Sequence, residues 1–466
     1  MRKETTNDDG AVRTAPEIRD ALDRKHAAIW DVATGQVPIK RVNEVKITMI
    51  STTNKPVEPV NQVIKLERKY MTQEQKDNAL PTGDANRSLD IGIIGVGGAG
   101  NHIADEFAKA GYESMVINLT DRDYNHLRYV PKDEDSRIQL ILGAGGAGKN
   151  PDVGADAIRQ YSKTLVNKIQ KKFNNKDFIF VACGLGGGTG TLGGALVAEI
   201  AASLDVPVGM IVTLPRKNEG TDEKVNCLRG LQEVANHKGI KSIVVIDNQR
   251  VLDRLKGFKD SDFWTAANKE IVNLFDTFNR WSTIASNTAF DAEDYKKCLM
   301  TPGFLLLGSQ DIDTNFISND SSATQLKEAV DSIGKGYLAT GFDYKTAVRA
   351  AGIIIKPANY DYAHSFEEQL FSHLKDEIGA GGLNRGIYTN DNMTGFVLVH
   401  TMLAGMKLPT ARVQELVTEA KAEASEMSKK IEERQTEIVA IDIPTEFGTV
   451  SGMASNKTNS SLGRRK

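Results

Sequence analysis

The sequence predicts an α/β fold with a mainly parallel sheet in an N-terminal domain, a long central helix, a smaller α/β second domain, and a long C-terminal helix followed by a tail. Two observations predict it. From residue 89 onward, short and continuously apolar segments alternate with helical patterns, and a longer amphipathic segment separates two such sets. Strands that are apolar throughout are typical of parallel sheets with helices on both faces.

The 466 residues divide into six predicted segments. They are a polar, partly disordered extension (1–88), a first domain (89–260), the central helix (261–282), a second domain (283–408), a charged helix (409–438) and a flexible tail (439–466). Within the extension, residues 54–84 have the proline and polar content of a linker. Nine strands are expected, at 89–97, 115–120, 137–143, 178–184, 206–214, 242–247, 303–309, 352–357 and 396–400.

Composition excludes several classes of protein. Lys and Arg (58) nearly balance Asp and Glu (61), which argues against a protein whose whole surface binds a polyanion. Any nucleic-acid contact must be local, and no direct sequence-specific binding of DNA is expected. Three cysteines are too few for a disulfide scaffold and the seven histidines lack metal-ligand spacing, so we expect a reducing compartment and no metal site built by side chains alone. No apolar stretch is long enough to cross a membrane, which predicts a cytoplasmic protein.

Three glycine-rich loops follow predicted strands. The first, Gly95–Gly100, fits the pattern G-x-G-x-x-G, and Asp121 stands where a dinucleotide fold carries its ribose-binding acid. Taken alone, this loop fits an NAD(P)-dependent oxidoreductase or a tight turn without a ligand. The second, Gly143–Asn150, approaches a P-loop, but asparagine and then proline stand where the P-loop hydroxyl belongs, which excludes it.

The third loop, Gly184–Thr191, reads GLGGGTGT. Its backbone N–H groups form a nest suited to a diphosphate or triphosphate, and the hydroxyls of Thr189 and Thr191 are further candidate donors. A dinucleotide fold needs one such loop, whereas three at the ends of strands in one sheet surround a single polyphosphate. The pattern therefore favours a nucleoside triphosphate over NAD.

These loops resemble those of the tubulin/FtsZ superfamily. GGGTGT at 186–191 is close to that family's signature, and IGVGGAGN (94–101) and GAGKNPDVG (146–154) are similar to two of its nucleotide loops. TLP at 213–215, VVIDN ending at Asn248 and TPG at 301–303 most resemble the TubZ branch of plasmids and phages. The resemblance covers about residues 89–434 and implies a Rossmann-like GTPase domain, GTP or GDP with Mg²⁺, and a head-to-tail homopolymer in a bacterial host cell.

The resemblance also implies residue roles. Positions that cradle phosphates match Gly97, Gly98, Gly100, Gly186, Gly187, Gly188, Thr189, Gly190 and Thr191. Asn101 matches a base contact, and Ala147, Gly148 and Asn150 match a loop that senses the γ-phosphate. Glu219 resembles a ribose-binding acid, and Asn248 a ribose or base contact. Two positions depart from the family: Glu223 stands where a basic residue is usual, and Leu192 replaces the last glycine of the signature.

The central helix carries the implied guanine reader. Trp264 and Asn268 lie one turn apart on one helix face and match an aromatic residue and an asparagine that contact the base. A carboxamide offers both a donor and an acceptor, which suits the guanine edge. Without the glycine loops, a core tryptophan and a surface asparagine would be the default interpretation.

The segment after the central helix resembles the family's catalytic loop, N-x-D-x-x-[DE], with Ala289 in place of the asparagine and with Asp291 and Asp294 retained. The resemblance implies that these carboxylates act on the nucleotide of the next subunit by polarising a water, with Asp294 ranked before Asp291. The alternative is an acidic first turn of a helix.

The resulting hypothesis is a GTPase that forms dynamic filaments and segregates or positions plasmid or phage DNA through a DNA-bound adaptor protein. The charged helix at 409–438 and the tail are the candidate adaptor surface, against the alternative of a solvent-exposed helix with a disordered end. An FtsZ-like division protein or another phage tubulin remains as a rival, although the tail lacks the apolar peptide of division proteins. The oxidoreductase alternative leaves residues 184–191 and Asn268 unexplained.

Overall fold

A computed structural model describes residues 71–81, 86–141, 145–255, 259–314, 317, 338–339, 341–360, 364–378 and 381–439. Most of the predicted N-terminal extension and almost all of the predicted tail lie outside these residues. None of the described helices is long and apolar enough to cross a membrane.

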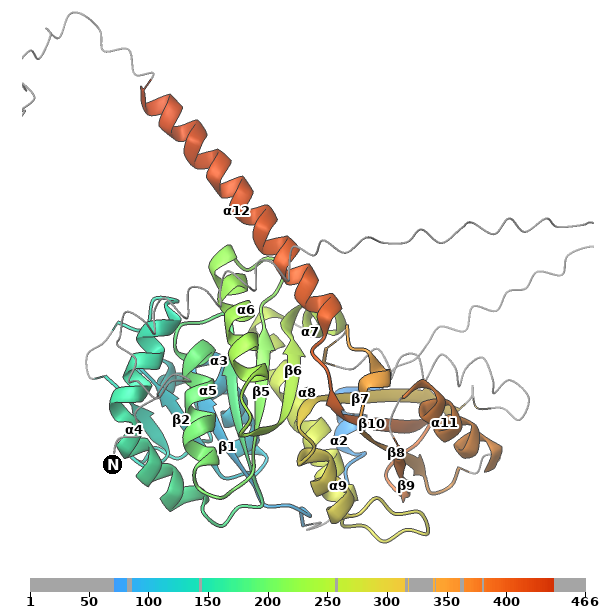
Figure 1. Cartoon of the computed structure of the whole chain (residues 1–466). Coiled ribbons are helices and arrows are strands. Elements are labelled where there is room, and N and C mark those ends of the chain that lie inside the picture. The colour runs from blue at the N-terminus through green and yellow to red at the C-terminus, as the bar shows by residue number, and fades with distance from the viewer. Residues whose placement is uncertain are drawn as a thin grey trace, which may run out of the picture.

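One ten-stranded sheet forms the centre of the molecule (Figure 1), in the order β3-β2-β1-β4-β5-β6-β7-β10-β8-β9. All neighbours from β3 to β7 are parallel, β10 is antiparallel to both β7 and β8, and β9 is parallel to β8. The strands are β1 (Ile91–Val96), β2 (Ser114–Asn118), β3 (Arg137–Gln139), β4 (Phe178–Gly184), β5 (Val208–Leu214), β6 (Ile240–Asp247), β7 (Gly303–Asp313), β8 (Arg349–Pro357), β9 (Leu383–Asn390) and β10 (Phe396–Met406).

Helices connect these strands and cover the sheet. The α-helices are α2 (Gln73–Asp77), α3 (Gly97–Lys109), α4 (Pro151–Phe173), α5 (Thr189–Ala202), α6 (Thr221–Ala235), α7 (Asn248–Arg254), α8 (Asp260–Trp281), α9 (Ala292–Leu299), α11 (His364–Glu377) and α12 (Thr410–Val439). Two short 3₁₀ turns, η1 (Arg122–His126) and η3 (Tyr344–Thr346), complete the described elements.

The apolar strands have a core on each face, as their sequence predicts. In β1, Ile93 belongs to the core beneath α3 and α8, whereas Ile94 belongs to the core beneath α4, α5 and α6. Phe107 of α3 meets Phe275 of α8 edge to face, with ring centroids 5.6 Å apart. A third cluster lies beneath α11, at the β8 and β10 end of the sheet.

The two predicted strand sets form one continuous sheet, because β7 pairs with β6. The central helix, α8, matches the predicted 261–282 within one residue at each end, and α12 matches 409–438 equally well. The structure adds β9, which the sequence analysis missed. It also starts α3 at Gly97 and α5 at Thr189, so the glycine loops run directly into helical first turns.

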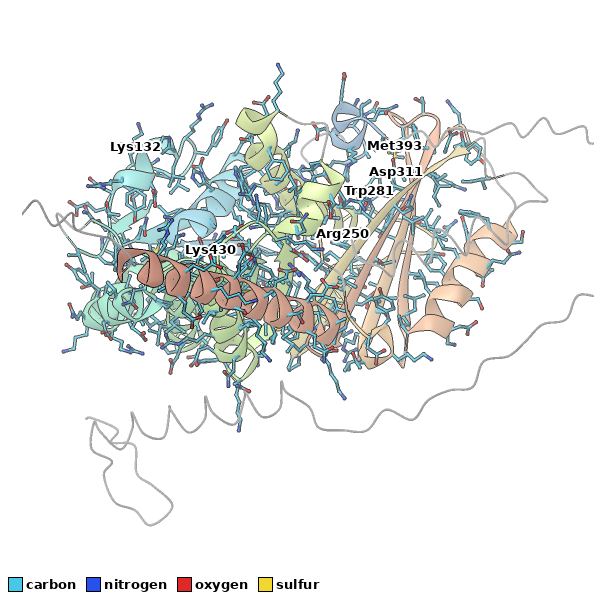
Figure 2. All side chains as sticks on the ribbon, turned by 90° about the horizontal axis from the view of Figure 1, so that it is seen from above. Lys132, Arg250, Trp281, Asp311, Met393 and Lys430 are labelled. Carbon is cyan, nitrogen blue, oxygen red and sulfur yellow. The ribbon has the colours of Figure 1, made fainter. Side chains whose placement is uncertain are left out.

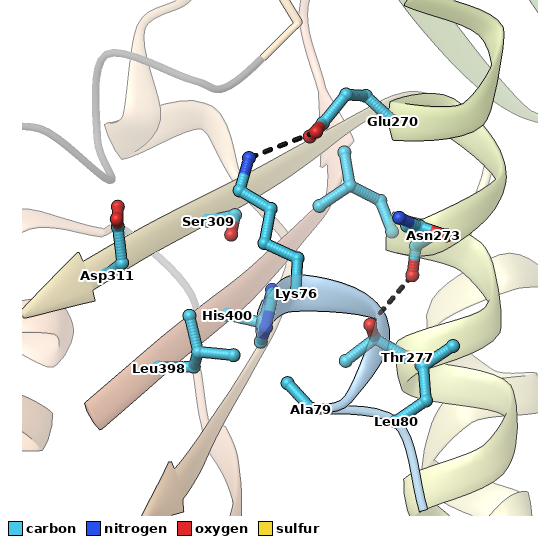
Figure 3. A pocket seen from close by; sticks show the side chains of 11 residues that line it. Lys76, Ala79, Leu80, Glu270, Asn273, Thr277, Ser309, Asp311, Leu398 and His400 are labelled. Carbon is cyan, nitrogen blue, oxygen red and sulfur yellow. Dashed lines mark hydrogen bonds and ion pairs between the residues drawn. The ribbon is translucent and has the colours of Figure 1, made fainter. Parts of the chain in front are cut away.

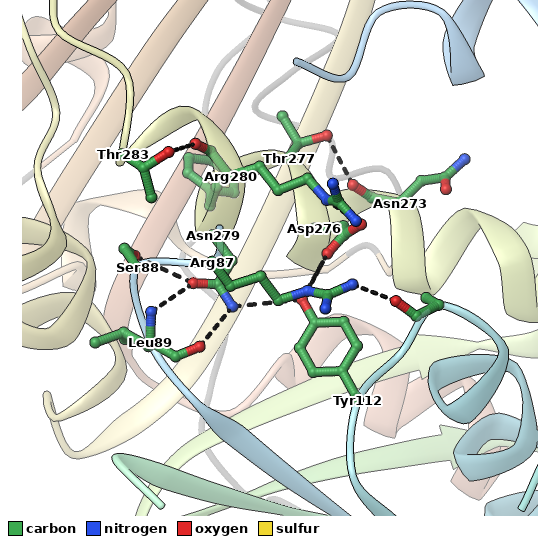
Figure 4. Close-up of polar contacts among 12 residues, drawn as sticks. Arg87, Ser88, Leu89, Tyr112, Asn273, Asp276, Thr277, Asn279, Arg280 and Thr283 are labelled. Carbon is green, nitrogen blue, oxygen red and sulfur yellow. Dashed lines mark hydrogen bonds and ion pairs between the residues drawn. The ribbon is translucent and has the colours of Figure 1, made fainter. Parts of the chain in front are cut away.

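A buried carboxylate joins α8 to the segment before β1 (Figure 4). Asp276 accepts hydrogen bonds from Arg87 Nε, Tyr112 Oη and Arg280 Nε, each at 2.8 Å. One turn further, Asn279 pairs with both backbone groups of Leu89, at 2.9 and 3.0 Å. Since charge-assisted hydrogen bonds are the stronger kind, this network fixes the central helix against the first strand.

The predicted linker at 54–84 is wrong for residues 71–81, which form α2 and its flanks. Lys76 of α2 pairs with Glu270 of α8 at 3.0 Å, and Lys269 pairs with Asp77 at 2.6 Å. Figure 3 shows α2 between α8 and the strand residues Asp311 and His400, around a cavity of about 30 Å³. Burial lowers the pKa of His400 to about 3, so the imidazole beneath α2 is neutral.

Helix α12 leaves the body of the molecule after its first turns (Figure 1). Seen from above, it lies across the helices of the first strand set, with Lys430 on its distal part (Figure 2). Arg412 near its start forms a buried ion pair with Asp247 at 2.7 Å. The distal part exposes Met427 and Ile431, at 61% and 48%.

Candidate functional site

A pocket of about 190 Å³ opens at the carboxyl ends of β1 and β4, where the three glycine loops meet. Parallel strands place their carboxyl ends on the same edge of a sheet, so loops far apart in sequence converge there. The lining residues are Val96, Gly97, Gly98, Ala99, Asn118, Thr120, Asp123, Gly146, Ala147, Gly148, Lys149, Gly184, Gly187, Gly188, Thr189 and Gly190.

Two helices begin at this pocket. α3 starts at Gly97 and α5 at Thr189, and neither has a side-chain cap for its first backbone N–H groups. Gly97 has φ +72°, and a Cβ there would lie 3.0 Å from the backbone nitrogen of Gly190. Uncapped N–H groups and two helix dipoles therefore converge in a place that attracts an anion.

Gly187 and Gly188 have different functions in the third loop. A Cβ on Gly188 would collide with Ala147 and crowd Asn150, so this glycine lets two loops touch. A Cβ on Gly187 meets nothing within 4 Å, although Gly187 lines the pocket. Its missing side chain leaves room for a ligand.

Several predicted phosphate contacts lie outside the pocket. Gly100 allows α3 to pack on Ala182, and Gly186 faces Glu223. The Thr191 hydroxyl is buried and donates to Leu185 O at 2.7 Å and Gly187 O at 2.5 Å. In this arrangement the hydroxyl proton serves the loop itself, and a phosphate contact by Thr191 stays a prediction.

Asn101, predicted as a base contact, is fully buried under the first loop. With its amide nitrogen directed toward the loop, it donates to Gly95 O at 3.0 Å and Gly97 O at 3.2 Å. This geometry makes Asn101 a support of the first loop, and it places the side chain outside the pocket.

The predicted residues of the second loop do not all lie in the pocket. Ala147 and Gly148 line the pocket. Asn150 instead caps α4, because its side chain accepts from Asp152 N at 3.0 Å and Pro151 occupies the first helical position. The residue pair that excluded a P-loop in the sequence is thus a helix start.

Three pocket residues escaped the sequence analysis: Asn118, Thr120 and Asp123. Asn118 ends β2 and the other two follow it, and Asn118 Nδ2 donates to Asp123 Oδ2 at 2.6 Å. Their position after an apolar strand of the same parallel sheet was the available signal. The acid considered for the dinucleotide alternative, Asp121, is exposed and does not line the pocket.

The predicted ribose and base contacts follow β5, β6 and the start of α8. Glu219 accepts from Arg216 N at 2.8 Å, and the Arg216 guanidinium lies 5.3 Å from the ring centroid of Trp264, which is 44% exposed. Asn268 lies one turn further along α8 and is half-buried, and Asn248 is the first residue of α7. None of these side chains lines the phosphate pocket.

The predicted catalytic carboxylates lie at the other edge of the sheet. Asp291 caps α9 and accepts from Asp294 N at 2.9 Å, which is the acidic first turn that the sequence analysis weighed. Burial, and then the charge of Asp291, raise the pKa of Asp294. Lys296 of the same helix lies 3.8 Å from Asp177, immediately before β4. The glycine loop follows the far end of β4.

This placement separates the two groups by about the length of one strand. β4 has seven residues, which span about 23 Å at roughly 3.3 Å per residue. The carboxylates of α9 and the phosphate pocket therefore cannot meet within one chain.

Comparison with known proteins agrees with this architecture. Residues 90–256 match the tubulin/FtsZ family GTPase domain, and residues 288–410 match the C-terminal domain of tubulin-like protein TubZ. The tubulin-like protein TubZ of Bacillus cereus is 28% identical over 365 residues, which cover 72% of this chain and 83% of that protein. The tubulin-like protein CetZ of Pyrococcus furiosus is 27% identical over 351 residues, covering 74% and 92%.

Solved structures give the same result. A GTPγS-form protofilament of TubZ from Bacillus thuringiensis serovar israelensis superposes with a TM-score of 0.63 at 25% identity, covering 76% of this chain and 96% of that one. The fold also matches a TubZ-Bt four-stranded filament, with a TM-score of 0.66 at 24% identity over 80% and 100%. The chain belongs to the tubulin/FtsZ superfamily, in its TubZ branch, and carries that family's GTPase domain.

Proposed function

We propose that the chain binds GTP in the glycine-loop pocket and hydrolyses it only when α9 of a second copy reaches that pocket. The observation that carries this proposal is the position of the two halves at opposite edges of one sheet. Copies stacked head to tail would bring the α9 edge of one onto the loop edge of the next. Hydrolysis would then be limited to assembled chains.

The pocket fits the phosphates of a nucleotide. Backbone N–H groups at the starts of α3 and α5 are suited to the anion, and the open space beside Gly187 leaves room for it. The group of Trp264, Asn268 and Glu219 would take the base and ribose. Asn268 is the candidate for selecting guanine, since its amide can both donate and accept.

Asp123, with Thr120 beside it, fits Mg²⁺. Magnesium prefers oxygen ligands and is usually held by one or two carboxylates together with the substrate phosphates. Asp123 is the carboxylate that lines this pocket, and its contact with Asn118 orients it. Bound there, Mg²⁺ would neutralise charge on the terminal phosphates.

Asp294 is the candidate general base, acting on a water next to the partner copy's terminal phosphate. A general base works best when its pKa is raised toward the working pH, and burial together with Asp291 raises that of Asp294. Asp291 holds the first turn of α9 through its cap and places a second carboxyl group beside the base.

Filament formation is supported by relatives whose structures are described as TubZ protofilaments and two-stranded or four-stranded filaments. A further relative is described as a type III plasmid segregation TubZ. We extend both properties to this chain, with a DNA-bound adaptor as partner and plasmid or phage DNA as cargo. The exposed distal part of α12 is the candidate adaptor surface. An FtsZ-like division role is the rival, but the match of residues 288–410 to the TubZ C-terminal domain favours segregation.

Sedimentation with different nucleotides tests the proposed function. We expect pelleting with GTP and with GTPγS, more persistent pellets with GTPγS, and no pelleting with ATP or GDP. Equal pelleting with ATP and GTP, or none with any nucleotide, would contradict it.

A further inference from the structure

Lys149 has an unusual backbone for its residue type. Its φ is +61°, and among the described residues other than glycine only Asp205 shares a positive φ. Side chains disfavour this region, which glycine adopts freely. The conformation is held from outside, because Asn226 Nδ2 donates to Lys149 O at 2.8 Å and to Gly186 O at 3.4 Å. A lysine thus occupies a position where glycine would fit more easily.

Lys149 is an exposed residue at the border of the phosphate pocket. Lys149 lines the pocket, and its ammonium pairs with the carboxylate of Glu223 on α6. The hydrogen bond that Lys149 donates to Glu223 raises the pKa of Lys149. Burial acts to raise the pKa of Glu223, but the contact with Lys149 outweighs it and the pKa is lowered, so both partners are charged.

The adjacent lysine of α6 cannot replace Lys149. Lys224 is fully buried and donates to Lys217 O and Glu219 O at 2.8 Å each, and it pairs with Glu423 of α12. Its ammonium is committed to the backbone of the loop after β5. Lys149 is therefore the one cation among the residues that line the pocket as the structure describes it.

Strand order indicates which phosphate Lys149 would meet. The base-side residues follow β5 and β6 or lie in α8, and the N–H cradle follows β1 and β4. The loop of Lys149 follows β3, which is the outermost strand on the side of the sheet away from β5 and β6. A nucleotide whose base lies on the β5 side and whose phosphates cross the cradle directs its terminal phosphate toward this loop.

We propose that Lys149 binds the terminal phosphate of the bound triphosphate and exchanges its ion pair with Glu223 for that phosphate. The inference rests on the proposed GTP site and adds a means of distinguishing GTP from GDP. A doubly charged phosphate is a stronger acceptor than a single carboxylate, so the triphosphate competes successfully, whereas a diphosphate leaves Lys149 on Glu223. Breaking the ion pair with Glu223 costs free energy, and Glu223 weakens GTP binding by that amount.

Three variants separate this role from a structural one. Lys149→Gly removes the ammonium and suits the backbone, so the loop keeps its shape. Lys149→Arg keeps a cation, and Glu223→Gln keeps the size of the side chain but removes the competing charge. Affinities for GTPγS and GDP would be measured by calorimetry below the assembly concentration, with thermal unfolding as a check on the fold.

We expect Lys149→Gly to weaken GTPγS binding roughly tenfold to a hundredfold, the range for a hydrogen bond to a charged group. GDP binding should change by no more than about threefold, since in the GDP state Lys149 stays on Glu223. Glu223→Gln should tighten GTPγS binding but have no such effect in the Lys149→Gly background. Lys149→Arg should recover most of the GTPγS affinity.

Equal weakening of GTPγS and GDP by Lys149→Gly would assign Lys149 a structural role and overturn the inference. Unchanged GTPγS affinity would overturn it too, while wild-type binding of GTPγS and GDP would leave the proposed site standing. A wild-type protein that binds no guanine nucleotide would instead contradict the proposed function, and this inference with it.

Discussion

The two edges of the parallel strands are built from different chemistry. The edge at the carboxyl ends presents backbone N–H groups from glycine loops and two uncapped helix starts. The opposite edge presents Asp291 and Asp294 at the start of α9, where the side chain of Asp291 already caps the N–H group of Asp294. One edge suits phosphates and the other suits the activation of water.

The difference teaches where hydrolysis can occur. Asp123, the carboxylate in the pocket, already accepts from Asn118 and is better placed for a cation than for a water. Asp294, whose pKa is raised, lies about the length of β4 away. Under the proposed function, each chain would hold two half-sites that a second chain joins, and hydrolysis would be coupled to assembly.

The largest loss of GTP affinity is expected when a side chain fills the open space in the phosphate pocket. In Gly187→Val the branched side chain would occupy the open space that the ligand needs, so GTP affinity should fall more than about a hundredfold while the apo fold is kept. The measurement is GTPγS binding, with apo thermal unfolding for comparison. Gly382→Val is the matched control, because a Cβ at Gly382 also meets nothing within 4 Å and this glycine lies far from the pocket in sequence and in the sheet. Normal GTP binding by Gly187→Val would show that the loop is only a turn.

The next effect concerns the opposite edge. Asp294→Ala should lower the GTPase rate by about 10² to 10⁴, the usual contribution of a general base, and leave GTP affinity unchanged. Its filaments should persist, and mixing it into wild type should slow filament turnover beyond simple dilution. Glu293→Ala on the same helix, which removes a carboxylate 3.8 Å from Lys297, is the control and should hydrolyse normally. A normal rate for Asp294→Ala would refute the assignment.

A moderate effect is expected at the base. Asn268→Ala should weaken GTP binding by about 1 to 3 kcal/mol, because a polar edge of guanine loses its partner. ATP binding, weak from the start, should change little, so the preference for GTP over ATP should shrink. Competition between GTP and ATP on both proteins measures this ratio. An unchanged ratio would remove Asn268 from the base contact.

The smallest effect separates the two aspartates. Hydrolysis needs ionised Asp294, so the rate should fall as the pH drops through its raised pKa. Asp291→Asn keeps a good helix cap but removes a negative neighbour, which lowers the pKa of Asp294 and moves the acid limb to lower pH. The pH profile of the rate at saturating GTP measures the shift. A collapse of the rate at every pH would instead make Asp291 the base.

The sequence predicted the sheet well because its buried strands are continuous apolar runs. β9 escaped because Leu383–Asn390 reads LNRGIYTN, without such a run, at an edge paired only with β8. The sequence alone could not show that Gly187 faces open space whereas Gly100 lets a helix pack on a strand, because both are simply glycines in a loop pattern. That distinction depends on which atoms lie opposite each Cα.

Polar residues of the site were harder to assign than the glycines. Thr191 and Asn101 have side chains suited to ligands, but these side chains donate hydrogen bonds to backbone carbonyls of their own loops. Asp123 was missed because it belongs to no glycine motif and reaches the pocket only through the strand order. Sequence gives the donors and acceptors, whereas their partners depend on the fold.

The central claim is that one active site needs two chains, and the GTPase rate per subunit as a function of protein concentration tests it most directly. We predict a rate near zero in dilute protein that rises more steeply than linearly as chains assemble, while Asp294→Ala stays low throughout. A rate per subunit that is the same at every concentration would contradict the account, since the active site would then be complete within one chain.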